Sequence, residues 1–198
     1  MSLYRNKYRS GSARLKGWDY RNAGSYFITI CTKNRTHFLG ECKDGKMYLS
    51  GMGAIVWDCW YDIPQHFSNA ALDVFQVMPN HMHGIIFLDG TLPLRNGDAD
   101  ALQCNASASP SILIPEIPPK KNEFFQKISP KPGTVSTIIR SFKSVCSKNI
   151  HLSFSNISFA WQDRFHDHII RNKEEHYRIR NYILNNPANW KDDTFYIG

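Results

Sequence analysis

The elements that the sequence predicts, taken in order, indicate the α+β class, with helices packed on an antiparallel sheet. Two observations support this class. Segments rich in β-branched and aromatic residues alternate with segments of helical periodicity. Strand-like segments that follow each other closely are joined by tight turn signals, as antiparallel neighbours are. The length of 198 residues suits one domain over 1–198 that carries an insertion.

The first part of the chain predicts a strand, a hairpin and a helix. The segment SYFITICT at 25–32 is typical of a strand. Residues 37–51 predict a short hairpin that turns at Lys43-Asp44-Gly45, because Asp-Gly is a strong turn dipeptide. Residues 52–67 predict a helix, whose apolar residues recur at four-residue steps. We expect Pro64 to end or kink this helix.

Two more strands are predicted at 71–78 and 81–88, joined by the turn signal Pro79-Asn80. The composition then changes. Residues 89–132 are rich in proline, serine, asparagine and alanine and show little periodicity. We therefore expect a long loop-like insertion at 89–132, partly disordered.

A helix, a strand and a last helix follow the insertion. Residues 134–149 carry an amphipathic stripe, formed by Val135, Ile138, Ile139, Phe142, Val145 and Cys146. Residues 159–171 predict a strand. Residues 172–187 predict a helix, and Asn172 with Glu175 resembles a capping box at its start. This element order predicts a ferredoxin-like antiparallel sheet with helices over one face.

The chain is basic, with a formal net charge of +7, which favours an acidic partner such as nucleic acid. Residues 1–22 form a basic arm, in which aromatic residues lie between cations that include Arg14 and Lys16. Cations bind phosphates, and aromatic rings stack on unpaired bases. The helix at 134–149 has no acidic residue and adds Arg140, Lys143 and Lys148. A solvated tail and an ordinary solvated helix face are the alternatives.

The cysteines and the apolar segments bear on location. The five cysteines are scattered, odd in number and without a CxxC motif, so we expect a reduced, cytoplasmic protein. The N-terminal residues lack the apolar core of a secretory signal. No apolar run approaches the roughly 20 residues of a membrane span, so no membrane partner is expected.

The stretch VMPNHMHGII at 77–86 places His81 and His83 one residue apart. Alternate residues of a strand share a face, so the two rings are expected to point the same way. That arrangement suits a metal ion held from one side. Two histidines at a strand end that bind water or carbonyl groups are the alternative.

Two histidines leave a metal site incomplete, and the last helix offers further ligands. Tyr182 and Asn186 are four residues apart and so share a helix face. A half-buried tyrosine with a solvated hydroxyl explains Tyr182 equally well. A second pair, His166 and His168, has the same spacing as the first, and spacing alone does not rank the two pairs.

Five stretches together resemble the single-tyrosine HUH transposases of bacterial insertion sequences, in particular the REP-associated tyrosine transposase branch. HUH denotes His, a hydrophobic residue and His, here His81-Met82-His83. The other stretches are KGWDYRNAGSYFITICTKNR, IIRSFKS, WQDRFHDHIIRN and YRIRNYILNNPANW. They occur in the family's order and cover most of the chain outside 89–132.

The resemblance implies an RRM-like, ferredoxin-like core with the histidine pair on a central strand. It implies that His81 and His83 bind the family's usual Mg²⁺ or Mn²⁺, that Asn186 completes the site, and that Tyr182 is the nucleophile. Some members carry Gln at the position of Asn186. The resemblance makes His168 an active-site neighbour and leaves His166 open. Mn²⁺ is expected to serve well, because imidazole is softer than Mg²⁺ prefers.

The resemblance also implies an activity: a metal-dependent transposase, that is, a single-stranded DNA endonuclease and strand transferase. It would cleave DNA at hairpin or repeat ends through a 5′-phosphotyrosine intermediate and rejoin it by 3′-hydroxyl attack. No Gly-rich phosphate loop is present, in agreement with a reaction that needs no ATP. Relatives act as a monomer or a homodimer, and the sequence does not decide between them. It also leaves open the role of 89–132 and whether the protein is mobile or domesticated.

Three rival interpretations remain at the level of sequence. A non-catalytic single-stranded nucleic-acid-binding module needs only exposed aromatic residues on an RRM-like sheet. A metal-independent phosphoesterase with two His-x-Ser/Thr motifs is disfavoured, because the third positions are His83 and His168. In a structural or interaction protein, the clustered polar residues would be a coincidence.

Overall fold

The computed structural model describes residues 3–4, 8–9, 23–88 and 133–196. Strands β1 (Leu3–Tyr4) and β2 (Tyr8–Arg9) pair with each other. The rest of the expected basic arm, Arg14 and Lys16 included, lies outside the described residues. So does the expected insertion over 89–132.

A four-stranded antiparallel sheet forms the centre of the fold, in the order β6-β7-β3-β8. Its strands are β3 (Gly24–Cys31), β6 (Ala70–Met78), β7 (His81–Leu88) and β8 (His166–Ile170). Two consecutive α-helices lie between β3 and β6 in the chain, and among the described residues one helix lies between β7 and β8. This β-α-β-β-α-β order is the ferredoxin-like arrangement, so the predicted fold class is confirmed.

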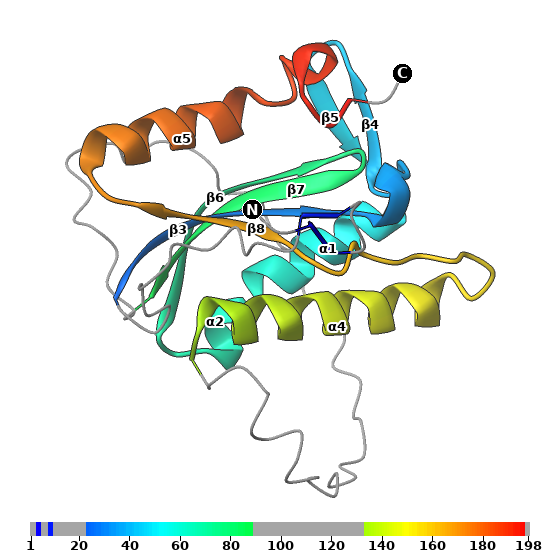
Figure 1. The fold of residues 1–198 in the computed structure, drawn as a ribbon. Helices are drawn as coiled ribbons and strands as arrows, with labels where there is room; N and C mark the ends of the chain where they lie inside the picture. The colour runs from blue at the N-terminus through cyan, green and yellow to red at the C-terminus, as the bar shows by residue number, and fades with distance from the viewer. Residues whose placement is uncertain (1–2, 5–7, 10–22, 89–132, 197–198) are drawn as a thin grey trace, which may run out of the picture.

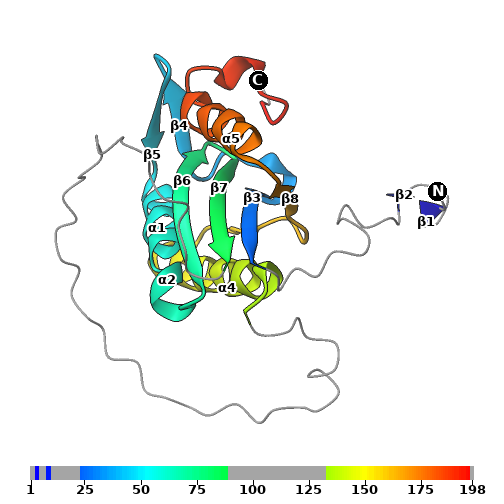
Figure 2. The ribbon, with the colours of Figure 1, turned by 90° about the vertical axis from the view of Figure 1, so that its left-hand side faces the viewer.

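The helices divide between the two faces of the sheet (Figures 1 and 2). Helices α1 (Gly51–Tyr61), α2 (Ile63–His66) and α4 (Val135–Ser153) lie on one face. Helix α5 (Lys173–Asn185) lies on the opposite face. The expectation of helices over one face is therefore correct only for the first layer. No helix among the described residues is both long enough and apolar enough to cross a membrane.

The larger hydrophobic core lies between the sheet and the first helix layer. Tyr26, Ile28 and Ile30 of β3 are fully buried there with Trp60 of α1. The indole of Trp60 lies directly under Gly84 of β7, where a Cβ atom would come within 2.4 Å of its Cζ2 atom. The stripe predicted for 134–149 packs into this core as α4, except for Val145, which is 45% exposed.

A smaller apolar cluster joins the opposite face of the sheet to α5. Its buried members are Ile85, Phe87, Ile170, Ile179 and Ile183. Strand β7 contributes residues to both cores and is buried along its whole length. This burial on both faces explains why its sequence is a continuous apolar run and not an alternating one.

Strand β6 contains a β-bulge beside α5. Leu72 pairs with Ile86 and Phe75 with Gly84, so β6 has one more residue than β7 between these two pairs. Leu72 and Phe75 both pack in the larger core. The extra residue allows Asp73 and Val74, which lie between them, both to face α5.

Three expected elements differ from the structure. The helix expected at 52–67 divides at Asp62 into α1 and α2, with Pro64 in the first turn of α2. The strand expected at 159–171 is regular only over β8. The helix expected at 134–149 continues to Ser153.

The predicted hairpin is present as β4 (Gly40–Lys43) and β5 (Lys46–Leu49). Its turn residues, Asp44 and Gly45, both have positive φ angles, as an Asp-Gly turn requires.

Candidate metal centre and active site

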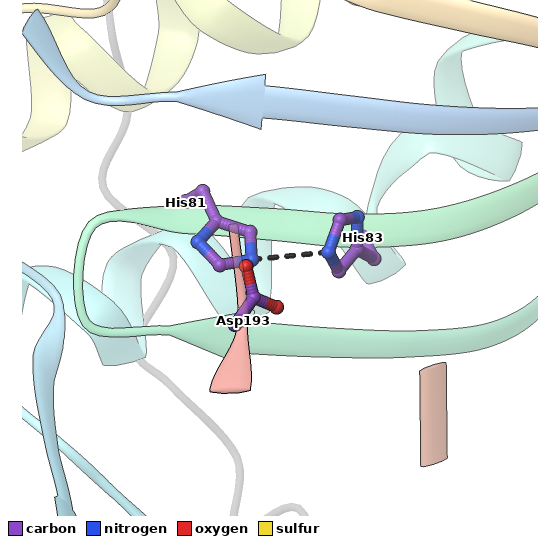
Figure 3. Close-up of side chains that lie close together, drawn as sticks. All are labelled: His81, His83 and Asp193. Carbon is purple, nitrogen blue, oxygen red and sulfur yellow. Dashed lines mark hydrogen bonds between the residues drawn. The ribbon is translucent and has the colours of Figure 1, made fainter. Parts of the chain in front are cut away.

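The histidine pair lies at the start of β7, immediately after the turn at Pro79-Asn80. His81 and His83 project from the face that α5 covers, and both side chains are buried. Their Nε2 atoms are 3.0 Å apart (Figure 3). The structure therefore brings the two rings together as the alternating strand geometry predicts.

Neighbouring side chains orient both rings. The Nδ1 atom of His81 lies 2.8 Å from Oδ1 of Asn80, while the Asn80 amide nitrogen donates to the Phe195 carbonyl. Since Asn80 Oδ1 can only accept, the Nδ1 atom of His81 carries the proton and Nε2 keeps its lone pair. The Nδ1 atom of His83 lies 2.9 Å from the Thr29 hydroxyl. Such partners fix ring orientation and tautomer in metal-ligating histidines.

Both histidines are held neutral. Burial, and to a smaller extent the positive charge of Arg35, lower the pKa of His81 to about 3. Burial also lowers the pKa of His83 well below its ordinary value, with a smaller effect of His81. Neutral imidazoles whose Nε2 atoms converge are the form in which histidine binds a metal.

Helix α5 places Tyr182 over the pair. The Tyr182 hydroxyl lies 3.3 Å from the Nε2 atom of His83, and the two ring centroids are 5.2 Å apart. Tyr182 remains 44% exposed, so the residue contacts the histidines and also reaches solvent. Partial burial, followed by the negative charge of Asp193, raises the pKa of Tyr182 to about 12.

Asp193 is a third candidate ligand that the sequence analysis did not identify. Its carboxylate and the ring nitrogens of His81 and His83 all lie within 4.8 Å of one another (Figure 3). One carboxylate oxygen accepts the backbone N–H of Phe195, and the other accepts the Asn186 amide. Asp193 follows the short helix η2 (Trp190–Asp192), so no helical or strand periodicity indicates where it points.

Asn186 also reaches this site. Its side chain is buried, and its Nδ2 atom donates to Asp193 over 2.7 Å. Its Oδ1 atom is buried and has no hydrogen-bond partner. A buried acceptor without a partner is costly, and a cation would satisfy it. The two imidazoles and the Asp193 carboxylate form a group that could hold a divalent metal, and the Asn186 amide borders this group through its bond to Asp193.

The segment that follows α5 packs against His81 through Phe195. The ring of Phe195 lies 4.5 Å from that of His81, centroid to centroid. Arg35 holds this segment by donating to the Thr194 carbonyl and by lying over the Phe195 ring.

The second histidine pair lies on the edge strand β8, on the same face. Thr29 pairs with His83 on one side and with His166 on the other, so these three residues form a row across the sheet. His168 lies one row away and bonds Glu175 at the start of α5 over 2.8 Å. The structure thus places His166 in the same row as His83, and it ties His168 to the helix that carries Tyr182.

The predicted DNA-binding cations lie apart from this site. Arg140, Lys143 and Lys148 are on α4, across the sheet from the histidines. Arg140 and Lys148 are exposed, whereas the Lys143 ammonium donates to the carbonyls of Gln162 and Asp163. Their expected contacts with DNA stay predictions.

Comparisons with known proteins bear on the family and on the fold. No protein-family model matches the chain. An uncharacterised protein of Haemophilus influenzae is 32% identical over 196 residues, which cover 96% of this chain and 98% of that protein. Among solved structures, a REP-associated tyrosine transposase bound to a REP hairpin matches with a TM-score of 0.51 and 18% identity. The match covers 89% of this chain and 74% of that chain.

The identity to the Haemophilus protein extends over nearly the whole of both chains, and the structural match covers most of the described core. The protein therefore belongs to the same family as that Haemophilus influenzae protein, and it has the fold of a REP-associated tyrosine transposase.

Proposed function

We propose that this protein is a transposase, a single-stranded DNA endonuclease and strand transferase that uses Tyr182 as its nucleophile. The observation that carries the proposal is the approach of the Tyr182 hydroxyl to within 3.3 Å of a buried, neutral histidine pair. A binding module does not need a tyrosine hydroxyl, two imidazoles, an amide and a carboxylate at one point.

The metal of this site would be Mg²⁺ or Mn²⁺, held by His81 and His83 with oxygen from Asp193 and Asn186. When bound, it would supply Lewis-acid polarisation of the scissile phosphate. Asp193 adds a carboxylate to the ligand set that the resemblance implies. The two nitrogen ligands favour Mn²⁺ over Mg²⁺ in such a mixed set.

The protein's own residues would carry the strand exchange. The Tyr182 oxygen attacks the phosphorus, the bond from phosphorus to the 3′-oxygen breaks, and a 5′-phosphotyrosine forms. The phenol loses its proton in this step, and the released 3′-oxygen gains one. A pKa of about 12 means that almost all Tyr182 is protonated near neutrality, so the site must assist this proton loss. In the second step, a 3′-hydroxyl attacks the phosphotyrosine and the tyrosine leaves.

The substrate that we propose is single-stranded or hairpin DNA, acted on in the cytoplasm by a monomer or a homodimer. The solved REP-associated tyrosine transposase is bound to a REP hairpin, which supports a hairpin ligand for this relative in fold. Arg14, Lys16, Arg140, Lys143 and Lys148 remain our candidates for backbone contacts.

A cleavage assay with labelled hairpin DNA from repeats flanking the gene tests this proposal. In Mn²⁺, we expect wild type to form a covalent protein–DNA adduct, and Tyr182→Phe and His81→Ala to form none. Tyr177→Phe is the matched control, because Tyr177 is on the same helix and 68% exposed. An adduct that survives Tyr182→Phe would refute the nucleophile. Tight, metal-independent binding without any adduct would instead favour the single-stranded nucleic-acid-binding module.

Metal binding is measured separately from activity. We expect Mn²⁺ to raise the melting temperature of wild type and to leave that of His83→Ala nearly unchanged, since a ligand stabilises only the state that binds it. Asp193→Asn and Asn186→Ala, compared in the same titration, show which oxygen donor contributes more to affinity.

A further inference from the structure

The helix that carries Tyr182 is fastened to the edge of the sheet by one carboxylate. Asp73 of β6 accepts a hydrogen bond from His176 Nε2 at 2.8 Å through one oxygen. Its other oxygen accepts from Arg180 Nε at 3.4 Å. The Asp73 side chain is only 10% exposed, and His176 and Arg180 are 24% and 39% exposed. We call these three residues the Asp73 clasp.

The bulge in β6 is what makes the Asp73 clasp possible. In a regular strand, Asp73 and Val74 would point to opposite faces. The extra residue lets Val74 pack in the apolar cluster under α5 while Asp73 reaches the same helix. Bulges commonly re-aim a side chain beside an active site.

Apolar packing alone fixes the rotation of α5 poorly. The cluster beneath the helix is small, with five buried members, and apolar contact is not directional. A charge-assisted hydrogen bond is directional. His176 and Arg180 are one turn apart on α5, so one carboxylate that bonds both restrains the helix's rotation and its position along its axis. The contact of His168 with Glu175 holds the start of the helix at the opposite edge of the sheet.

Tyr182 follows Arg180 by two residues on the same rigid helix. A rotation or slide of α5 therefore carries the Tyr182 hydroxyl away from His83. In-line attack tolerates little displacement, and an error of about 1 Å can lower a rate on the order of 100-fold. We propose that Asp73 is a positioning residue, which holds the tyrosine helix in the register that attack on DNA requires. This inference rests on the proposed function of Tyr182.

The test compares Asp73→Asn with wild type in the full chain, in Mn²⁺ and with the hairpin DNA used above. We expect the single-turnover rate of adduct formation to fall about 10-fold to 100-fold, and the dissociation constant for DNA to stay within about 2-fold. Backbone hydrogen exchange should accelerate in α5 and stay unchanged in α1 and α4. Glu41→Gln is the matched control, because Glu41 forms an exposed ion pair with Lys43 outside α5.

A double-mutant cycle separates positioning from general stability. Arg180→Gln should slow the reaction in the same direction, and adding it to Asp73→Asn should cost less than the sum of the two effects. Arg180→Gln also serves alone if Asp73→Asn does not fold. A rate within about 2-fold of wild type, or equal losses of rate, DNA affinity and stability, would overturn the inference.

The proposed function and this inference fail in different ways. If wild type forms no adduct, the proposed function fails, and the Asp73 clasp is judged by hydrogen exchange of α5 alone. If wild type forms an adduct that Tyr182→Phe loses, but Asp73→Asn reacts at the wild-type rate, only the inference fails.

Discussion

His81 and His83 are uncharged because the fold surrounds them, not because of any partner acid. Burial is the main cause of both lowered pKa values, and the protonated form of either ring would place a charge inside the protein. Neutral imidazoles are the form of histidine that binds a cation. The same burial makes the histidines sensitive to acid.

We expect the stability of the metal-free protein to fall as the pH falls below about 6.5. The unfolded chain then binds protons at these two residues, whereas the native His81 does not until about pH 3. Each histidine should lower the free energy of unfolding by up to about 1.4 kcal/mol per pH unit in that window. Urea denaturation with a chelator at about pH 7 and about pH 5.5 measures the slope.

The double variant His81→Leu/His83→Leu is the control for this slope. It should lose most of the pH dependence, because it keeps two apolar side chains of similar bulk and removes the groups that titrate. An unchanged slope in the double variant would assign the acid sensitivity to other residues.

Sequence reasoning predicted that His81 and His83 share a face but did not predict that Asp193 lies beside them, and the reason is physical. His81 and His83 lie on a strand, where a period of two decides which side chains share a face. Asp193 reaches them from a short turn after α5, where the path of the backbone decides the direction of the side chain. The two acids in KDD at 191–193 look alike in the sequence, and only the second faces the histidines.

At the scale of elements, α4 carries two cations that face solvent and one whose ammonium is already hydrogen-bonded within the protein. Arg140 and Lys148 extend into solvent, while Lys143 fastens α4 to the loop at 162–163. Burial lowers the pKa of Lys143, consistent with this structural use. A run of basic residues on one helix can thus serve two purposes.

We expect Arg140→Gln and Lys148→Gln each to weaken binding of single-stranded DNA and to reduce the salt dependence of binding. Loss of one phosphate contact lowers the slope of log K against log salt by about 0.7. Lys143→Gln should change that slope less and lower the stability more, because its ammonium already donates to two carbonyls. Fluorescence anisotropy at several salt concentrations measures the slope. Wild-type slopes in the Arg140 and Lys148 variants would exclude α4 from the DNA interface.

The elements that were predicted well have strong local patterns, and those predicted poorly depend on distant contacts. The start of α5 follows from Asn172, whose side chain accepts the Glu175 N–H. The second half of the expected capping box differs, because Glu175 bonds the Arg171 N–H and His168 instead. The segment before β8 was predicted as a strand, and its alternating aromatic residues Phe159 and Trp161 are buried. In that segment, however, only Trp161 forms a β-bridge, to Thr32.

At the scale of the whole molecule, the sheet has a structural face, which packs on the larger core, and a face that carries the candidate site. One face rests on the large core beneath α1 and α4, and the other carries the histidines, Tyr182 and the Asp73 clasp. The ferredoxin-like order follows from sequence, since it needs only the succession of strands and helices. That α5 covers the second face does not follow, because its apolar stripe would fit either face.

Gly84 of β7 connects the packing on one face of the sheet with the position of the histidines on the other. It is next to His83 and points to the core, where the Trp60 ring occupies the space that a side chain would need. A single methyl group there would push β7 away from the core that Trp60 fills. We expect Gly84→Ala to lower the free energy of unfolding by about 1–3 kcal/mol, because the core has no room for it.

The same variant should weaken Mn²⁺ binding, although Gly84 cannot contact the metal. An added methyl group under β7 would displace His81 and His83 relative to Asp193 and Tyr182, which are carried by other parts of the chain. Calorimetric titration with Mn²⁺ at a temperature where the variant is folded measures this loss, and wild-type affinity would contradict it. The expected loss would show that Trp60, on the opposite side of the sheet from the histidines, helps to set their distance from Asp193.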